Sequence, residues 1–313
     1  MDFGKLTDIS GVDFGLSADP VFTKNTLQNY QSPPHKQLTP LELGINKPQI
    51  YVGPPIWANK EWTGKIYPNS AKEKDFLYHF ARQFNTIELN VTHYQVPNAA
   101  TIERWREAVT PDFRFCPKWP QEISHERQLL GCEPQTEAFM SAVLGLEKNL
   151  GTTFLQLAPY FGPWKFDVLE KFLRQIPANF PLAVEFRHPK WFEEPVWTQT
   201  LELLSSLGVG TVMSDVAGRR DVLHLALTTP ALMLRFVGNE LHPTDFSRVN
   251  EWAKRLKTWI EAGLQTATIF VHCGENIFAP ELSKYWIEQL NQECGLTLKA
   301  PVIQPKVVQG SLF

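Results

Sequence analysis

From Ile50 onward, the chain alternates short apolar runs with longer amphipathic segments. The short runs are rich in Val, Ile, Leu and Phe, as is typical of buried strands, and they cover residues 50–57, 85–90, 113–120, 153–159, 182–188, 209–215, 232–238 and 266–273. Between them, apolar residues recur at the spacing of one helical face, for example at Phe139, Val143, Leu146 and Leu150. The pattern therefore predicts strands that alternate with crossover helices.

Repeated alternation of this kind favours a parallel sheet, because parallel neighbours need long crossovers and helices must cover both faces. Eight units favour closure into a barrel, which removes both sheet edges. The alternative is a doubly wound open sheet, but no glycine-rich phosphate turn follows the first run. Residues 216–230 are irregular for a crossover helix. We predict an α/β protein with a single (β/α)8 TIM barrel.

The first 48 residues differ from the rest, since they show no regular period and contain the breaker-rich stretch QSPPHKQLTP at 31–40. The end of the chain is an extended polar and aliphatic segment. We therefore predict an N-terminal extension at 1–48, a barrel domain at 49–294 and a C-terminal tail at 295–313.

Composition narrows the class of protein. Apolar residues make up 43% of the 313 residues and charged residues 20%, a balance typical of a folded soluble domain. The net charge of −3 provides no global attraction to nucleic acid or to an anionic membrane. The four cysteines lack the spacing of a disulfide framework or a zinc site, and no apolar stretch is long enough to span a bilayer. We expect a cytoplasmic protein with reduced thiols and no membrane contact.

Chemistry in a (β/α)8 barrel gathers at the C-terminal ends of its strands. The predicted ends carry one aromatic residue and polar residues of both charge signs, namely Trp57, Glu88, Asn90, Lys118, Gln156, Glu185, Arg187, His188, Asp215, Arg235 and His272. Charges that face a barrel interior are costly unless they are paired or solvated, so a ring of them indicates a polar pocket. For any one residue, a structural ion pair at the rim is the alternative.

The stretch AVEFRHPKWF, at 183–192, shows how alternation sorts these residues. Glu185 and Arg187 are two positions apart and should point to the same side of their strand. His188 precedes a proline, which favours an extended conformation at the strand exit. Glu88 and Asn90 share a side by the same rule.

Four segments together resemble a known family: AVEFRHPKWF, FNTIELNVTHYQVPNAATIERW (84–105), FRFCPKWPQEISHER (113–127) and TFLQLAPYF (153–161). They are similar to the YecE-like proteins, also called domain of unknown function 72, over about residues 50–290. The resemblance implies a (β/α)8 barrel and brings no established reaction. The residues that match the family pattern are Glu88, Asn90, Lys118, Glu185, Arg187, Asp215 and Arg235. Residues 53–57, Val237-Gly238 and His272-Cys273 depart from it, which indicates a divergent member.

The mixed charges favour a site for an anion. Lys118, Arg187 and Arg235 would bind a phosphate or carboxylate, the arginines by bidentate contact. The acid and base candidates are Glu185, Glu88, Asp215 and His188. Asn90 and Gln156 would orient the ligand, and Trp57 could stack on a ring. The hypothesis is a metal-independent hydrolase, lyase or isomerase that acts on a phosphorylated or carboxylated compound.

Two other chemistries would use the same strand ends. A metal-dependent phosphodiesterase-like or isomerase-like barrel would take its ligands from Glu88, Glu185, His188, Asp215 and His272, but neighbouring arginines would repel a divalent ion. A retaining glycosidase would place carboxylates on strands four and seven, where the chain has Gln156 and Arg235. The metal-dependent enzyme remains the alternative.

The last five residues, QGSLF, suggest a function of a different class. They resemble the pentapeptide by which bacterial replication and repair proteins dock on the DNA sliding clamp, with Gln309, Leu312 and Phe313 as the anchoring side chains. The protein would then be a non-enzymatic accessory at DNA, and the anion could be a nucleic-acid phosphate. The alternative is a tail that packs on the protein's own surface.

Overall fold

The computed structural model describes residues 4–31 and 47–305. Each predicted apolar run overlaps a strand. The strands are β1 (Gln49–Gly53), β2 (Thr86–Leu89), β3 (Arg114–Pro117), β4 (Thr153–Gln156), β5 (Leu182–Glu185), β6 (Gly210–Asp215), β7 (Ala231–Gly238) and β8 (Thr266–Cys273). Every residue of β2, β4, β5 and β6 is buried. Strands covered on both faces explain why the sequence shows continuous apolar runs there.

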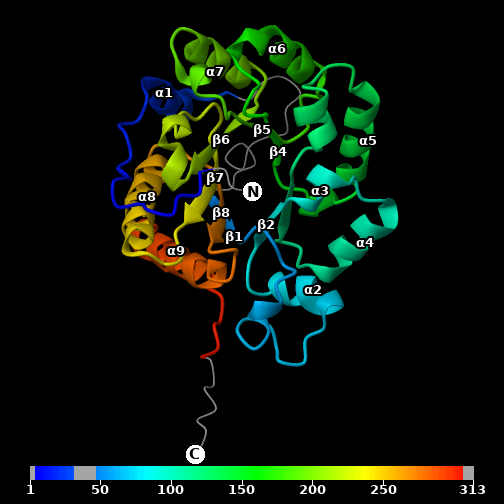
Figure 1. The fold of residues 1–313 in the computed structure, drawn as a ribbon, viewed down its shortest axis with the longest axis vertical. Helices are drawn as coiled ribbons and strands as arrows, with labels where there is room; N and C mark the ends of the chain where they lie inside the picture. The colour runs from blue at the N-terminus through cyan, green and yellow to red at the C-terminus, as the bar shows by residue number, and fades with distance from the viewer. Residues whose placement is uncertain (1–3, 32–46, 306–313) are drawn as a thin grey trace, which may run out of the picture.

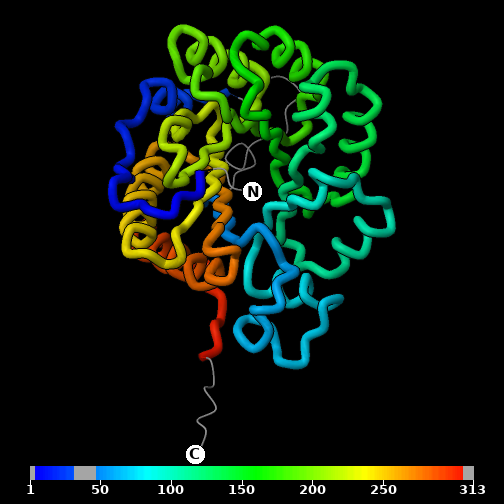
Figure 2. Tube along the Cα trace, viewed as in Figure 1, coloured from blue at the N-terminus to red at the C-terminus, as the bar shows by residue number. Residues whose placement is uncertain are grey.

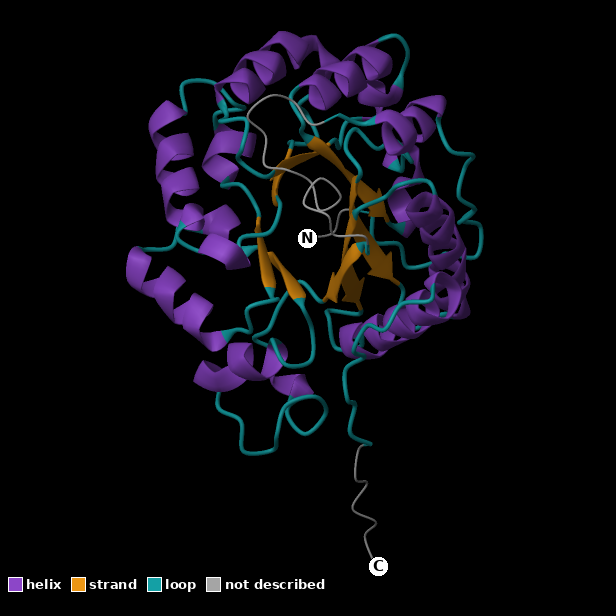
Figure 3. Cartoon of the chain, turned by 180° about the vertical axis from the view of Figure 1, so that it is seen from behind, coloured by secondary structure: helices purple, strands orange, loops and turns teal. Residues whose placement is uncertain are grey.

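All of the strand pairs are parallel. One sheet has six strands in the order β1-β8-β7-β6-β5-β4, and β2 pairs with β3 in a second sheet. The strands lie inside and the helices surround them (Figure 3). The protein is therefore an α/β fold built on a parallel six-stranded sheet and a parallel two-stranded sheet.

Side chains and single bridges link the two sheets. The amide of Asn85, just before β2, accepts from the Val52 backbone N–H at 2.9 Å and donates to the Ile50 carbonyl at 2.9 Å, in place of a backbone ladder. Gly53 lies so close to β2 that a Cβ there would be 2.1 Å from the Thr86 carbonyl oxygen. On the other side, the Trp119 backbone N–H donates to the Phe154 carbonyl at 3.0 Å.

The helices form the outer layer (Figure 1). Their bounds are α1 (Val21–Asn29), α2 (Phe76–Phe80), α3 (Val91–Tyr94), α4 (Ala99–Ala108), α5 (Glu133–Leu144), α6 (Phe166–Gln175), α7 (Val196–Ser206), α8 (Pro243–Glu261) and α9 (Ala279–Cys294). The connection after β6 contains the short 3-10 segment η7 (Ala217–Val222) and no α-helix, which accounts for the irregular pattern of 216–230. None of the helices in the described ranges is long and apolar enough to cross a membrane.

Residues 4–31 pack along the outside of the fold, beside η7 and α8 (Figure 2). The Thr23 hydroxyl donates to the Leu225 carbonyl at 2.6 Å and accepts from the Leu227 backbone N–H at 3.0 Å. Asp19 forms an ion pair with Arg255 of α8. This part of the N-terminal segment is therefore tied to the connection between β6 and β7 and to the helix after β7.

The described part of the tail, 295–305, is held by polar contacts. The Leu298 backbone N–H donates to Asn291 Oδ1 at 2.8 Å, and that of Gln304 donates to the Lys65 carbonyl at 2.8 Å. The residues Gln309, Leu312 and Phe313 lie outside the described residues, so the structure does not test the sliding-clamp hypothesis.

Candidate functional site

An apolar layer supports the candidate site. A small core cluster consists of Cys116, Phe154, Ala183, Val212, Met233 and Phe270. Each of its members stands two positions before a polar residue, and these are Lys118, Gln156, Glu185, Ser214, Arg235 and His272. Positions two apart in a strand share a side. The six strands thus form an apolar layer of side chains. Two residues nearer their C-terminal ends, they form a polar layer.

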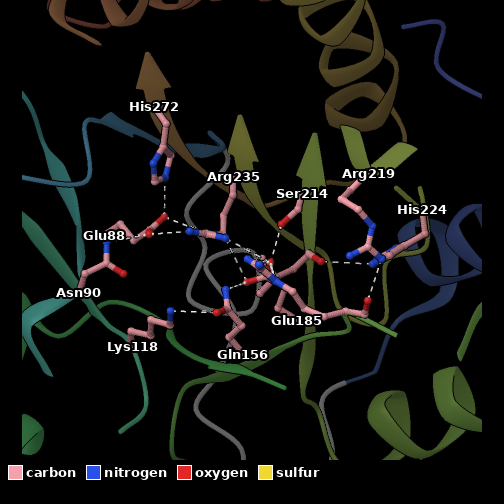
Figure 4. A network of polar contacts seen from close by, with 12 residues as sticks. Glu88, Asn90, Lys118, Gln156, Glu185, Ser214, Arg219, His224, Arg235 and His272 are labelled. Carbon is pink, nitrogen blue, oxygen red and sulfur yellow. Dashed lines mark hydrogen bonds and ion pairs between the residues drawn. The ribbon is translucent and has the colours of Figure 1, made fainter. Parts of the chain in front are cut away.

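Glu185, at the end of β5, is the centre of the polar layer (Figure 4). Its carboxylate accepts from Arg187 Nη2 at 2.8 Å, from the Ser214 hydroxyl at 2.7 Å and from Gln156 Nε2 at 2.7 Å. Arg235 Nη1 also donates to it, at 3.2 Å. The side chain of Glu185 is fully buried, so these donors replace the water it would otherwise bind.

Arg235 of β7 links Glu185 to a second buried carboxylate on β2. Its Nε and Nη2 each donate to a different oxygen of Glu88, both at 2.9 Å, which is a bidentate pair. Asn90 Nδ2 donates to Glu88 at 2.8 Å, and His272 Nε2 lies 3.0 Å from it. Strands far apart in the sequence therefore meet in one network of charges.

These contacts determine the charge of the carboxylates. Burial raises the pKa of Glu185, but Arg187 and Arg235 outweigh burial and hold that pKa well below its ordinary value of 4.5. Burial likewise raises the pKa of Glu88, and Arg235 and His272 hold it well below 4.5. Both carboxylates are therefore ionised near neutral pH.

Lys118, one residue beyond β3, reaches the network through Gln156. Its Nζ donates to Gln156 Oε1 at 2.9 Å, and Gln156 Nε2 in turn donates to the Glu185 carboxylate. Burial and the nearby charge of Arg235 lower the pKa of Lys118 to about 8, although Glu185 opposes this effect. Lys118 is thus a buried amine that exchanges its proton close to neutral pH.

Asp215 lies on the other side of its strand, so its predicted place in the polar pocket is wrong. Its carboxylate accepts from Arg248 Nη2 at 2.8 Å and from Trp252 Nε1 at 2.7 Å, both on α8, and it pairs with Arg220. Alternation along β6 gives the inward position to Ser214 instead. Asp215 therefore fastens the sheet to its covering helix and to η7.

Two other predicted residues lie outside the network of Figure 4. Trp57 packs edge-on against Trp105, with ring centroids 5.8 Å apart, and its carbonyl accepts from the Tyr67 hydroxyl at 2.8 Å. His188 accepts from the Lys190 backbone N–H at 3.2 Å and meets the ring of Trp164, with centroids 4.9 Å apart. These contacts of Trp57 and His188 are to neighbouring connections between the strands.

Sequence reasoning missed a pair of histidines beside Lys118. The rings of His93 and His125 lie 5.3 Å apart in an edge-on arrangement, and His93 Nδ1 lies 2.7 Å from the Trp119 carbonyl. Burial, together with the charge of Lys118, lowers the pKa of each to about 4, so both are neutral near pH 7. His93 lies in α3 and His125 in the short helical segment Glu122–Glu126, both outside the strands, where strand alternation gives no signal.

The donor set also bears on a metal. In the part of the chain that the structure describes, no three His, Cys, Asp or Glu residues are grouped so as to hold a metal ion. Of the five ligands considered from sequence, Glu88 and Glu185 already accept from guanidinium groups, and Asp215 faces α8. The three carboxylates are therefore arranged to hold cationic side chains.

The structure has a hollow at the N-terminal end of the strands, with a volume of about 150 Å³. Its lining includes Gly210, Thr229 and Thr268, and none of the described lining residues carries a charged side chain. We place the candidate site at the charged network and not here, since groups able to move protons or bind ions are at the C-terminal strand ends.

Comparison with known proteins places the chain in a family. The model of the family described as "Protein of unknown function DUF72" matches residues 51–306. The chain is 32% identical over 283 residues to UPF0759 protein YecE of Escherichia coli K12, covering 84% of this chain and all of that protein. It is 26% identical over 167 residues to UPF0759 protein YunF of Bacillus subtilis, covering 51% of this chain and 58% of that protein.

Solved structures agree at the level of the fold. A DUF72 family protein of Enterococcus faecalis superposes with a TM-score of 0.62 at 18% identity, over 80% of this chain and all of that one. A DUF72 family protein of Thermotoga maritima superposes with a TM-score of 0.59 at 23% identity, over 79% of this chain and all of that one. The family match and the YecE-like sequence show that this chain is a member of the DUF72 family.

Proposed function

We propose that this protein is a metal-independent enzyme, a hydrolase, lyase or isomerase, that binds a phosphate- or carboxylate-bearing small molecule at the C-terminal face of a (β/α)8 barrel. The observation that carries the proposal is the charge balance of the polar layer. Among the residues that the structure describes, Arg187, Arg235 and Lys118 bring three cationic groups to a centre that holds two carboxylates, Glu88 and Glu185. An anionic ligand group would complete the balance.

Closure of the strands into one barrel is part of the proposal. The Asn85 amide contacts between β1 and β2, and the isolated bridge between Lys118 and Phe154, support it. Barrel closure would bring β2 and β7 to opposite sides of one mouth, where Glu88 and Arg235 pair. A mouth of this kind is where barrels gather their catalytic groups.

The groups have different roles in this proposal. Glu88 and Glu185 stay ionised and hold the guanidinium groups in position, while Arg187 and Lys118 bind the anion. Lys118 is the group that exchanges a proton near neutral pH, since its pKa is about 8. The low pKa values of Glu88 and Glu185 make these carboxylates weak bases, so proton transfer falls to Lys118 and not, as the sequence predicts, to them.

Replacing Arg187 with Ala should weaken the binding of inorganic phosphate, or of a small carboxylate such as citrate, by at least tenfold. The guanidinium supplies charge-assisted hydrogen bonds that Ala lacks, and tenfold corresponds to about 1.4 kcal/mol. Titration calorimetry would measure the dissociation constants, with Arg174→Ala as the matched control on the exposed face of α6. Unfolding of Arg187→Ala with no anion bound by the wild type would instead support a purely structural ion pair.

The C-terminal pentapeptide is kept as a separate proposal, a sliding-clamp contact that makes the protein an accessory at DNA. Its support is the residue pattern of Gln309, Leu312 and Phe313. Deleting residues 309–313 should remove capture of the protein by immobilised bacterial clamp, while phosphate binding stays unchanged. Equal capture with and without these residues would end this proposal.

A further inference from the structure

We infer that Lys118 is an imine-forming catalytic residue, and that the substrate is a carbonyl compound, a 2-oxo acid or a phosphorylated aldehyde or ketone. The inference rests on the proposed anion site and specifies its substrate class. The anionic group would be held by Arg187, and the carbonyl carbon would lie at Lys118 Nζ.

The first observation is the pairing of the lysine. Its side chain is 2% exposed, yet in the described part of the chain its Nζ has a single partner, the neutral amide oxygen of Gln156. An ammonium carries three donors, and a buried one usually has a carboxylate partner. The two carboxylates of the network are paired with Arg187, Arg235 and His272 instead.

The second observation is that the backbone fixes the lysine at the strand end. The Lys118 N–H donates to the Leu89 carbonyl at 3.2 Å, and the Lys118 carbonyl accepts from the Thr92 hydroxyl at 2.7 Å. Cys116 and Phe154, of the apolar layer, lie one step below it and its partner Gln156. Such a position holds the amine still and favours its neutral, nucleophilic form.

The chemistry balances without a further reactant. The neutral amine of Lys118 adds to the carbonyl carbon, a C–N bond forms, and the carbonyl electron pair moves to oxygen, which takes up the proton lost by nitrogen. The carbinolamine then takes up one proton and loses water as its C–O bond breaks, and the nitrogen lone pair forms the iminium C=N bond. The iminium can accept the electron pair of an adjacent C–H bond, whose proton passes to water, or of an adjacent C–C bond, whose other fragment leaves as a carbonyl compound. The reaction class is therefore an isomerase or a lyase.

Trapping with borohydride tests the inference. The full-length protein would be treated with pyruvate or with glycolaldehyde phosphate in the presence of sodium borohydride, and the modified residue located by peptide mass spectrometry. We expect reduced adducts on Lys118 in the wild type and in Lys165→Arg, and none at that position in Lys118→Arg, which keeps the positive charge. The initial trapping rate should rise as the pH rises through about 8, because the neutral amine gains population there.

Each outcome is decisive for one of the two proposals. If competitive labelling with acetic anhydride modifies Lys118 but neither carbonyl compound gives an adduct there, Lys118 is not an imine-forming residue. Adducts found only on exposed lysines would also exclude Lys118 as an imine-forming residue. Phosphate binding, measured separately by calorimetry, tests the proposed anion site. If Arg187→Ala loses phosphate binding but no adduct forms on Lys118, the anion site is supported and the imine-forming role of Lys118 is excluded.

Discussion

Replacing Glu185 with Gln is expected to lower the free energy of unfolding by about 3 to 5 kcal/mol. The buried carboxylate accepts from Arg187 and Arg235, and a neutral amide would leave two buried guanidinium groups with less compensating charge. The amide group of the new side chain would also point a donor toward Ser214 or Gln156, which now donate to Glu185. Urea unfolding followed by circular dichroism would measure the change.

The pH dependence of this loss has a definite sign. The folded-state pKa of Glu185 is held below 4.5, so the stabilisation by its ionised form is present above pH 4.5 and lost as the pH falls below it. The difference between wild type and Glu185→Gln should shrink over the same range. Glu170→Gln, which removes an exposed pair with Arg174, should cost less than about 1 kcal/mol. A similarly small cost for Glu185→Gln would show that the network does not need this charge.

Most of the fold could be predicted from the sequence, because strands that are buried on both faces appear as continuous apolar runs. The apolar runs located all eight strands, but several runs extend past the strand ends, as at Phe186 and Arg187 beyond β5. Such residues leave the ladder and stay buried, so composition alone does not mark the end of the strand. The irregular stretch 216–230 correctly indicated the missing crossover helix after β6.

The site residues that lie on strands or directly beyond their ends could be predicted from the sequence by alternation, and those farther from the strands could not. Alternation places Glu88, Lys118, Glu185 and Arg235 on one side of their strands, and the structure brings them together. Alternation counted in steps of two from Val212 gives the inward position to Ser214 and puts Asp215 on the opposite side of β6.

Residues outside the strands depend on the packing of the whole chain. Strand alternation gives no guide to Trp57 and His188 in the connections, nor to His93 in α3 and His125 in the short helical segment Glu122–Glu126. Their positions follow from contacts with other connections, such as the Trp164 ring beside His188 and the Trp119 carbonyl beside His93.

Replacing Asp215 with Asn is the second change with a large expected effect, about 3 kcal/mol or more of lost stability. The carboxylate accepts from Arg248 and Trp252 of α8, and the Arg248 side chain is almost completely buried. Arg220 pairs with the same carboxylate and also donates to the carbonyl of Phe14 at 3.0 Å. Loss of the charge should therefore loosen residues 4–31 as well as α8.

The result separates a fastening role for Asp215 from a catalytic one. We expect Asp215→Asn to unfold at lower urea concentration and to be cleaved faster by protease within the N-terminal segment, while the folded protein binds phosphate as the wild type does. The exposed Asp112→Asn should change neither stability nor cleavage. Unchanged stability together with lost phosphate binding would instead return Asp215 to the ligand site, because its charge would then act on the anion and not on α8.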